Sequence, residues 1–113
     1  MAKIHVTPEA KRDLQHIKEY ITLELDSLAT AINTVFKITK SIRRIKDFPA
    51  LGAPLSGIVD IPNDYRFLVC GNYLVFYRQE GDNVNVIRVI YSRRDYTKIL
   101  FGITSDSNSE QDE

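Results

Sequence analysis

Three consecutive strands are predicted by the segments YRFLVC (Tyr65–Cys70), YLVFYR (Tyr73–Arg78) and VNVIRVIYS (Val84–Ser92). Each segment is rich in the β-branched and aromatic residues that favour strands. Gly71-Asn72 separates the first two segments, and Glu80-Gly81-Asp82-Asn83 separates the second from the third. Both connections have the composition of tight turns between antiparallel strands. The second half of the chain is therefore predicted to form a hairpin meander.

Two amphipathic helices are predicted before the meander. Thr7-Pro8-Glu9 supplies a hydroxyl cap, a proline at the first helical position and an acid near the positive end of the helix. Asp26-Ser27 offers a second cap, and Pro49 ends the second helix. The short break between them implies an antiparallel hairpin. The apolar positions that recur at helical spacing are Leu14, Ile17, Ile21 and Leu25 in the first helix, and Leu28, Ile32, Val35, Ile38, Ile42 and Ile45 in the second.

The remaining segments complete the predicted architecture. Lys3–Val6 is a short first strand, and the residues from Phe48 to Gly57 form a loop with two prolines and two glycines. Asp95 is placed to cap a short final helix. The predicted order is β-α-α-β-β-β-α, an α+β fold in which a helical hairpin packs on a small, mostly antiparallel sheet.

Length and composition indicate a single soluble domain. The chain has 113 residues, of which 43% are hydrophobic and 27% charged, which is typical of globular proteins. Its one cysteine, Cys70, cannot form an internal disulfide, so a reducing cytoplasm is expected, and its apolar surroundings predict a buried core residue. No signal peptide is recognisable, and no apolar run approaches the roughly 20 residues of a membrane span.

The zero net charge conceals an uneven distribution. Residues 103–113 hold four of the 15 acidic residues and no basic one, which leaves 11 acidic against 15 basic residues in the rest of the chain. Such a serine- and acid-rich segment cannot bury enough apolar surface to fold. We therefore expect a domain over residues 1–102 and a disordered acidic tail over 103–113. An alternative is that the tail lies over the basic face and weakens its binding.

Four blocks of the sequence resemble the RelE/ParE superfamily of bacterial toxins: Glu9–Ile21, Phe48–Gly52, Gly71–Arg78 and Val86–Tyr96. They occur in the order of that family, and the resemblance covers nearly everything from Lys3 to Gly102. It implies the toxin of a type II toxin–antitoxin module, of the kind that serves plasmid stabilisation, acting without cofactor or metal. It also implies an antitoxin that wraps the toxin with a helix and an extended segment.

The resemblance leaves two targets open. RelE-type toxins cut messenger RNA in the ribosomal decoding site, whereas ParE-type toxins inhibit DNA gyrase and are not nucleases. Cleavage of RNA by its own 2′-hydroxyl requires a general base, a general acid and cations that stabilise the extra phosphorane charge. Arg66 matches the first basic strand of the family, but it replaces a pair of lysines. The segment Gly71–Leu74 lacks the arginine of the nuclease motif.

The sequence favours the ParE-like branch, because the first helix and Val75-Phe76-Tyr77-Arg78 resemble ParE-type sequences more closely. The expected function is growth arrest through protein binding to DNA gyrase. The alternatives are ribosome-dependent, metal-independent mRNA cleavage and an inactive toxin fold that only binds its antitoxin. A general nucleic-acid-binding module is disfavoured because the basic excess is dilute. If the protein is an enzyme, it is an mRNA interferase.

Arginines and tyrosines gather where the last strand ends, at Arg93-Arg94-Asp95-Tyr96, a composition suited to a polyanion or a protein partner. The candidates for catalysis or target binding are Arg66, Arg93, Arg94 and Tyr96. The expected antitoxin contacts are Ile99, Leu100 and Phe101 of the final helix, with the adjoining sheet edge. Among the remaining polar and aromatic residues, Tyr65, Tyr73 and Tyr77 are assigned to sheet packing, and His5 and His16 to structural or surface positions. Arg78 and Arg88 are assigned to structural or antitoxin-facing roles, and the default for each is a solvent-facing pair with Asp64, Glu80 or Asp82.

Overall fold

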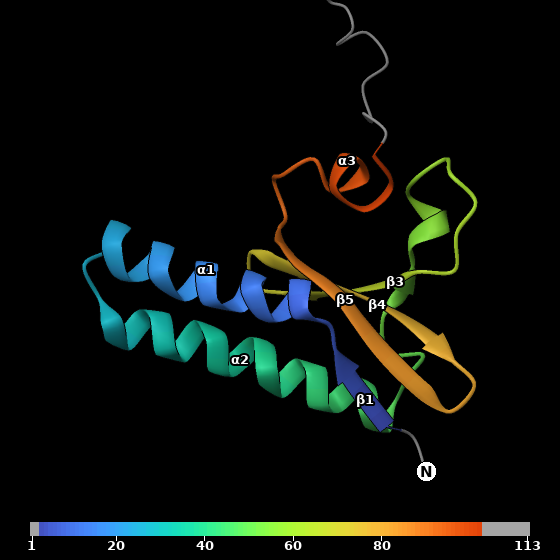
Figure 1. Cartoon of the computed structure of the whole chain (residues 1–113), viewed down its shortest axis with the longest axis horizontal. Coiled ribbons are helices and arrows are strands. Elements are labelled where there is room, and N and C mark those ends of the chain that lie inside the picture. The colour runs from blue at the N-terminus through green and yellow to red at the C-terminus, as the bar shows by residue number, and fades with distance from the viewer. Residues whose placement is uncertain (1–2, 103–113) are drawn as a thin grey trace, which may run out of the picture.

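The computed structural model describes residues 3–102 and has the predicted α+β architecture, with two long helices on one face of a five-stranded sheet (Figure 1). The predicted element order is confirmed. The acidic tail predicted for residues 103–113 lies outside the described residues. In chain order the elements are β1 (Lys3–Val6), α1 (Pro8–Glu24), α2 (Leu28–Asp47), β2 (Ala53–Pro54), the 3₁₀ turn η1 (Leu55–Gly57), β3 (Arg66–Cys70), β4 (Tyr73–Glu80), β5 (Asn83–Tyr91) and α3 (Tyr96–Phe101).

The strand order in the sheet is β1-β5-β4-β3-β2. Strands β3, β4 and β5 form the predicted antiparallel meander, and β1 pairs with β5 in parallel. The helical hairpin supplies the long connection that this parallel pairing requires. The segment predicted as a loop before the meander contributes two extra elements, the 3₁₀ turn η1 and the strand β2, whose residues Ala53 and Pro54 pair with the start of β3. Proline suits this position, since an edge strand leaves one side of its backbone unpaired.

Side-chain caps fix where the helices begin, as predicted. Thr7 accepts a hydrogen bond from the Ala10 amide at 3.1 Å, and Ser27 accepts one from the Thr30 amide at 3.1 Å. Asp95 caps α3 through the Lys98 amide at 3.2 Å. The Thr7 hydroxyl also donates to a carbonyl oxygen of β5 at 2.9 Å. The cap of α1 is thus also a link between that helix and the sheet.

The first core cluster lies between the hairpin and the sheet, and its largest side chain is Tyr77. The large buried side chains of α2 that reach it, those of Ile38, Ile42 and Ile45, come from the C-terminal half of the helix, whereas the buried residue of the N-terminal half is the small Ala31. Figure 1 shows the tip of the hairpin extending past the sheet. Of the apolar positions that recur at helical spacing, Leu25, Leu28 and Ile32 lie at this tip, and they are exposed because no strand lies beneath them.

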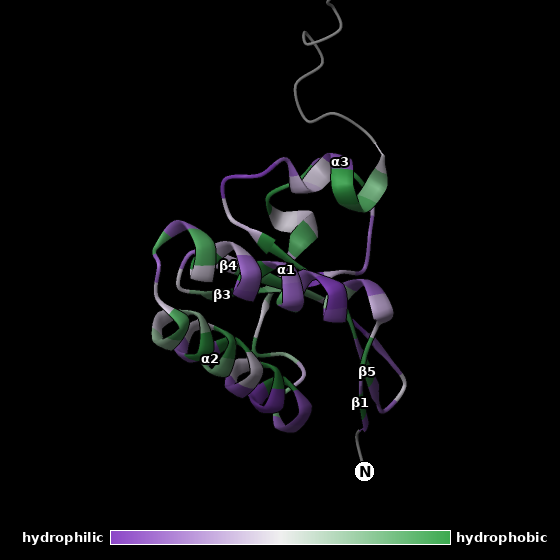
Figure 2. Ribbon diagram, turned by 60° about the vertical axis from the view of Figure 1, so that its left-hand side comes forward, coloured by the Kyte–Doolittle hydropathy of each residue, from purple (hydrophilic) through white to green (hydrophobic). Residues whose placement is uncertain are grey.

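A second core cluster covers the opposite face of the sheet. Its buried members are Leu55, Leu74, Phe76 and Ile90, and the apolar residues of α3 pack against them. The predicted return of the final helix onto the core is confirmed (Figure 2). Within residues 3–102, no helix is both long enough and apolar enough to cross a membrane.

Cys70 is half-buried rather than buried, which corrects the prediction of a core residue. It ends β3, and its sulfur accepts a hydrogen bond from the Ser41 hydroxyl at 3.4 Å. The neighbouring edge strand β2 pairs only with Arg66 and Phe67, so it ends before it reaches this part of β3. The flank of Cys70 is open for that reason.

The hydroxyl of Tyr77 holds the segment that follows α2 against the sheet. It donates to the Pro49 carbonyl oxygen at 2.6 Å and accepts from the Gly52 amide at 2.8 Å. The Gly52 carbonyl oxygen accepts in turn from the Arg66 guanidinium at 2.6 Å. Burial raises the pKa of Tyr77, so the phenol stays neutral and keeps its role as a donor.

Gly52→Ala is expected to lower the free energy of unfolding by about 1–3 kcal/mol, because overpacking a filled site strains it. A β-carbon there would lie 2.6 Å from the Phe67 carbonyl oxygen and 2.8 Å from the Tyr77 hydroxyl. Gly57→Ala is the matched control, since nothing lies within 4 Å of its β-carbon. Urea unfolding of both variants checks the prediction, and equal stabilities would contradict it.

Candidate functional site

The structure separates two of the predicted site residues. Arg66 begins β3, and its guanidinium donates to the Gly52 carbonyl oxygen. This contact lies beside Tyr77, which belongs to the first core cluster. Tyr96 packs on the opposite face, where its ring centroid lies 5.4 Å from that of Phe76. The sheet lies between these two side chains. They therefore cannot act together on one reacting group.

Arg93 and Arg94 lie in the turn after β5, and both are exposed. Backbone hydrogen bonds fix this turn, from the Ser92 amide to the Asn72 carbonyl oxygen at 2.8 Å and from the Arg94 amide to the Tyr91 carbonyl oxygen at 2.9 Å. The two arginines differ in their surroundings, because Arg94 lines a cleft beside α1 and Arg93 does not. The sequence alone does not distinguish them.

This cleft, named the tyrosine cleft below, lies between α1 and the paired ends of β4 and β5. Its volume is about 220 Å³. Asp13, His16 and Tyr20 share one face of α1, because their spacings of three and four residues bring them into line on a helix. That spacing was a signal available in the sequence. The lining residues are Asp13, His16, Ile17, Tyr20, Tyr73, Val89, Tyr91 and Arg94.

The cleft combines an apolar floor with phenol groups. Ile17 and Val89 are buried and belong to the first core cluster. The rings of Tyr73 and Tyr91 meet edge to face with centroids 5.8 Å apart, a favourable aromatic geometry. Burial, together with the neighbouring phenols of Tyr91 and Tyr20, raises the pKa of Tyr73. Tyr73 therefore packs in the sheet as predicted, and its phenol stays neutral beside the cleft.

The Asp13 carboxylate forms one wall of the cleft, and its charge is already compensated. It accepts two hydrogen bonds from the Arg88 guanidinium, at 2.7 and 2.8 Å, and one from the Val89 amide at 2.9 Å. The side chain of Asp13 is only 11% exposed and that of Arg88 25%. The hydrogen bonds that the Arg88 guanidinium donates to Asp13 raise the pKa of Arg88, so this guanidinium remains charged.

The pairing of Arg88 with Asp13 corrects the prediction of a solvent-facing pair with an acid of the meander. The prediction relied on regular alternation along β5. The register shifts between Phe76 and Tyr77 of the partner strand, where Phe76 faces Arg88 and Tyr77 faces Val86. A bulge of this kind changes where the neighbouring side chains point. Arg88 lies beside this shift, and its guanidinium reaches Asp13 of α1.

Two polar groups of the cleft remain available for a ligand. Within residues 3–102, the side chains of His16 and Arg94 make no hydrogen bond or ion pair. Both residues are exposed, so His16 lies on the surface as predicted, although at the rim of a cleft. In the same range, no group of three or more His, Cys, Asp and Glu residues could hold a metal ion. The described cleft is thus aromatic and cationic.

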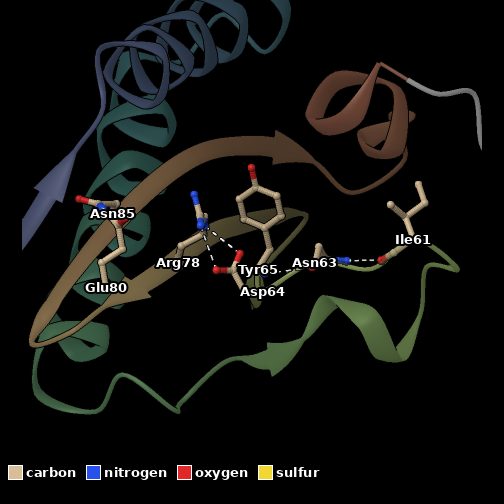
Figure 3. A network of polar contacts seen from close by, with 7 residues as sticks. All are labelled: Ile61, Asn63, Asp64, Tyr65, Arg78, Glu80 and Asn85. Atoms are coloured by element: carbon tan, nitrogen blue, oxygen red, sulfur yellow. Dashed lines mark hydrogen bonds and ion pairs between the residues drawn. The ribbon is translucent and has the colours of Figure 1, made fainter.

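Arg78 has a structural role on the other face (Figure 3). Its guanidinium donates to both carboxylate oxygens of Asp64, at 2.8 and 2.9 Å, which confirms the predicted pair, and it lies 5.6 Å from the Tyr65 ring centroid. The Tyr65 ring also lies 5.5 Å from that of Phe101 in α3. The Asn63 side chain accepts from the Tyr65 amide at 2.9 Å. These contacts hold the segment before β3 against the sheet and α3.

The largest group of exposed apolar side chains lies at the tip of the hairpin. Leu28, Ile32 and Phe36 follow one another at intervals of four residues, which gives a continuous stripe along α2. Each of the three is more than half exposed, and Leu23 of α1 is 78% exposed. Contiguous apolar surface of this kind is typical of a protein-binding site. The hairpin patch, as it is called below, consists of Leu23, Leu25, Leu28, Ile32 and Phe36.

A sequence model of the ParE toxin of the type II toxin–antitoxin system, parDE, matches residues 4–96. The chain belongs to this family. The RelE/ParE resemblance seen in the sequence is thereby confirmed, on its ParE side. The protein is a toxin of the type II class. No curated protein sequence matches it.

Solved structures of toxin–antitoxin systems are similar to the ParE-family chain. One chain of the chromosomal ParDE system from P. aeruginosa has a TM-score of 0.69 and 18% identity, over 80% of this chain and 96% of that one. Its similarity supports the fold. A chain of the RelBE2 toxin–antitoxin complex from Mycobacterium tuberculosis has a TM-score of 0.47 and 20% identity, over 79% of this chain and 95% of that one.

Arg88→Leu is expected to lower the free energy of unfolding by about 2–3 kcal/mol, because it leaves the Asp13 carboxylate with little water and no counter-ion. Arg78→Leu removes a second bidentate pair whose side chains are more exposed, at 38% and 64%, and is expected to cost less than about 1 kcal/mol. Chemical denaturation of the two variants compares them directly. Equal losses of stability would contradict the expectation that the less exposed Arg88–Asp13 pair contributes more than the Arg78–Asp64 pair.

Proposed function

We propose that this ParE-family protein arrests bacterial growth in the cytoplasm by binding DNA gyrase, and that a cognate antitoxin neutralises it. The observation that carries the proposal is the family match, which extends from residue 4 to residue 96. It includes α1, the sheet and the turn that bears Arg93 and Arg94. Gyrase is the target that the ParE-type resemblance implies.

The arrangement of the candidate residues supports protein binding over RNA cleavage. Arg66 is committed to the Gly52 carbonyl, and the ring of Tyr96 packs on the other face of the sheet. Arginine remains protonated in proteins, so it can bind phosphate but is a poor general acid or base. Among the four candidates, only the exposed Arg93 and Arg94 are adjacent. Such a pair suits the recognition of an acidic surface.

Ribosome-dependent, metal-independent mRNA cleavage is the second candidate function. The observation in its favour is that His16 and Arg94 line the same cleft. An imidazole can transfer protons near neutral pH, and a guanidinium can stabilise a phosphorane. This candidate would assign catalysis to a residue of α1, which is not the constellation that the RelE resemblance implies.

We further propose that the hairpin patch is the main antitoxin-binding surface. The expected contacts Ile99, Leu100 and Phe101 are only partly exposed, because they pack against the second core cluster. The residues of the hairpin patch are more exposed, and none of them belongs to either core cluster. An amphipathic antitoxin helix would bury it by the helix-in-groove mode. The α3 residues and the sheet edge then serve as a second contact.

The target prediction is tested with purified protein in two assays, gyrase supercoiling and cleavage of a defined messenger RNA on 70S ribosomes followed by primer extension. Inhibited supercoiling with intact messenger RNA is expected. The variant Arg93→Ala/Arg94→Ala is expected to inhibit at least tenfold less, because each lost cation removes an interfacial contact. Arg43→Ala/Arg44→Ala is the matched control, since it removes an adjacent, exposed pair from α2.

Cuts that need both ribosome and toxin, and that disappear in Arg93→Ala/Arg94→Ala, would contradict the gyrase proposal and favour the nuclease. Activity in neither assay, with no growth arrest and with antitoxin binding intact, would favour an inactive toxin fold.

The antitoxin prediction compares three single variants by calorimetry. Ile32→Glu is expected to weaken antitoxin binding at least tenfold, because a charge would be buried in an apolar contact. Asn33→Glu adds the same charge at the next exposed position of α2 and is expected to change affinity less than threefold. Leu100→Glu tests the α3 contact. Loss of affinity in Leu100→Glu alone, in a variant that remains folded, would place the main interface on α3.

A further inference from the structure

The structure points to a second binding site, and we propose that the tyrosine cleft binds a nucleoside monophosphate, with its base against the apolar floor and phenols and its phosphate at Arg94. This inference is independent of the gyrase proposal. It rests on the shape of the cleft, on its aromatic rim and on the two polar groups left available there.

The floor and rim suit a flat ring. Ile17 and Val89 provide a dry, apolar surface, and the edge-to-face pair of Tyr73 and Tyr91 forms the wall from the sheet. Tyr20 is 63% exposed and Tyr91 39%, so aromatic surface remains open to water around this floor. A stacked ring would bury that surface, and stacking of bases on aromatic side chains stabilises their binding.

The charges of the cleft favour an anion. The negative charge of Asp13 is compensated by two hydrogen bonds from Arg88 and one from the Val89 amide. Glu19, also on α1, accepts a hydrogen bond from Gln15 and borders a different groove. Arg94 therefore faces the cleft as a cation without a side-chain partner among the described residues. A guanidinium whose hydrogen-bond donors are not used by other side chains is well suited to bind a phosphate.

The polar edge of the ring distinguishes a nucleobase from a phenyl ring. Neutral phenols can donate and accept hydrogen bonds, and an imidazole offers one donor and one acceptor. The raised pKa of Tyr73 keeps its phenol in the neutral form. A phosphorylated phenyl ring has no polar atoms along its edge to meet these groups, whereas every nucleobase has several. The chemistry of the rim therefore favours a nucleotide over a phosphotyrosine.

The size of the cleft limits the ligand to one nucleotide. Its volume of about 220 Å³ is smaller than the roughly 300–1,000 Å³ of sites for drug-sized molecules. One base fills such a space, and its phosphate would remain at the mouth with Arg94. The same chemistry could be presented by a free mononucleotide or by one residue of a single strand. We assign it to the free mononucleotide, because the described cleft is small.

The experiment measures binding of AMP, GMP, CMP and UMP to the full chain by calorimetry, with saturation-transfer NMR to identify the ring protons in contact. A dissociation constant on the order of 1 mM or below is expected for at least one of them. Arg94→Gln is expected to weaken that binding at least fivefold, and so is Tyr91→Ala. Arg93→Gln is the matched control, because it removes the adjacent cation outside the cleft. Circular dichroism establishes that each variant is folded.

Three results would overturn the proposal: no binding of any mononucleotide, equal affinity for inorganic phosphate alone, or equal losses in Arg93→Gln and Arg94→Gln. The second would leave a plain anion site, and the third a diffuse electrostatic attraction. If a tetranucleotide binds more than tenfold tighter than any mononucleotide, with the same dependence on Arg94 and Tyr91, that result would support recognition of a base and a phosphate in the cleft. It would then identify the ligand as one residue of a single strand and not a free mononucleotide. None of these readouts depends on gyrase inhibition, so either proposal can fail without the other.

Discussion

The contact on which the arrangement depends is the one between Asp13 of α1 and Arg88 and Val89 of β5. It joins residues 75 positions apart in the chain, and it does so with a carboxylate that is nearly buried. A charge held away from water requires nearly all of its hydrogen bonds, so the helix cannot slide or rotate without losing them. This constraint fixes the distance between α1 and the sheet. The tyrosine cleft exists because the helix is held at this place beside the ends of β4 and β5.

The sheet divides the molecule into two faces with different roles. One face carries the helical hairpin, the cleft and the exposed hairpin patch. The other carries α3 and the segment before β3, both held by the cluster around Arg78 and Tyr65. This division explains why Arg66 and Tyr96 do not meet, although both were reasonable candidates.

The sequence predicted the elements of this fold because their signals are local. The caps at Thr7, Ser27 and Asp95 act within one helical turn, and the turns at Gly71 and Gly81 require the positive φ of 59° that each glycine adopts. The errors concern relations between elements. The partner of Arg88 lies on a helix 75 residues away in the chain. The exposure of Cys70 depends on the length of an edge strand, and the exposure of Ile32 depends on where the sheet ends. The site was predicted only in part for the same reason. Asp13, His16 and Tyr20 could be aligned on a helix from sequence, whereas Tyr73 and Tyr91 meet only through the pairing of β4 with β5.

The surfaces that this fold does not use for its own stability are the ones best suited to partners. Ile38, Ile42 and Ile45 anchor the C-terminal half of α2 in the first core, so substitutions there would unfold the protein before they revealed anything about binding. Leu28, Ile32 and Phe36 are outside both cores. Keeping large apolar side chains exposed favours self-association in the free protein, and a patch of them is typical of a surface that a partner covers. The α3 residues differ, because a change there disturbs the second core along with any interface. A loss of binding is therefore easiest to interpret on the hairpin, where binding and folding depend on different atoms.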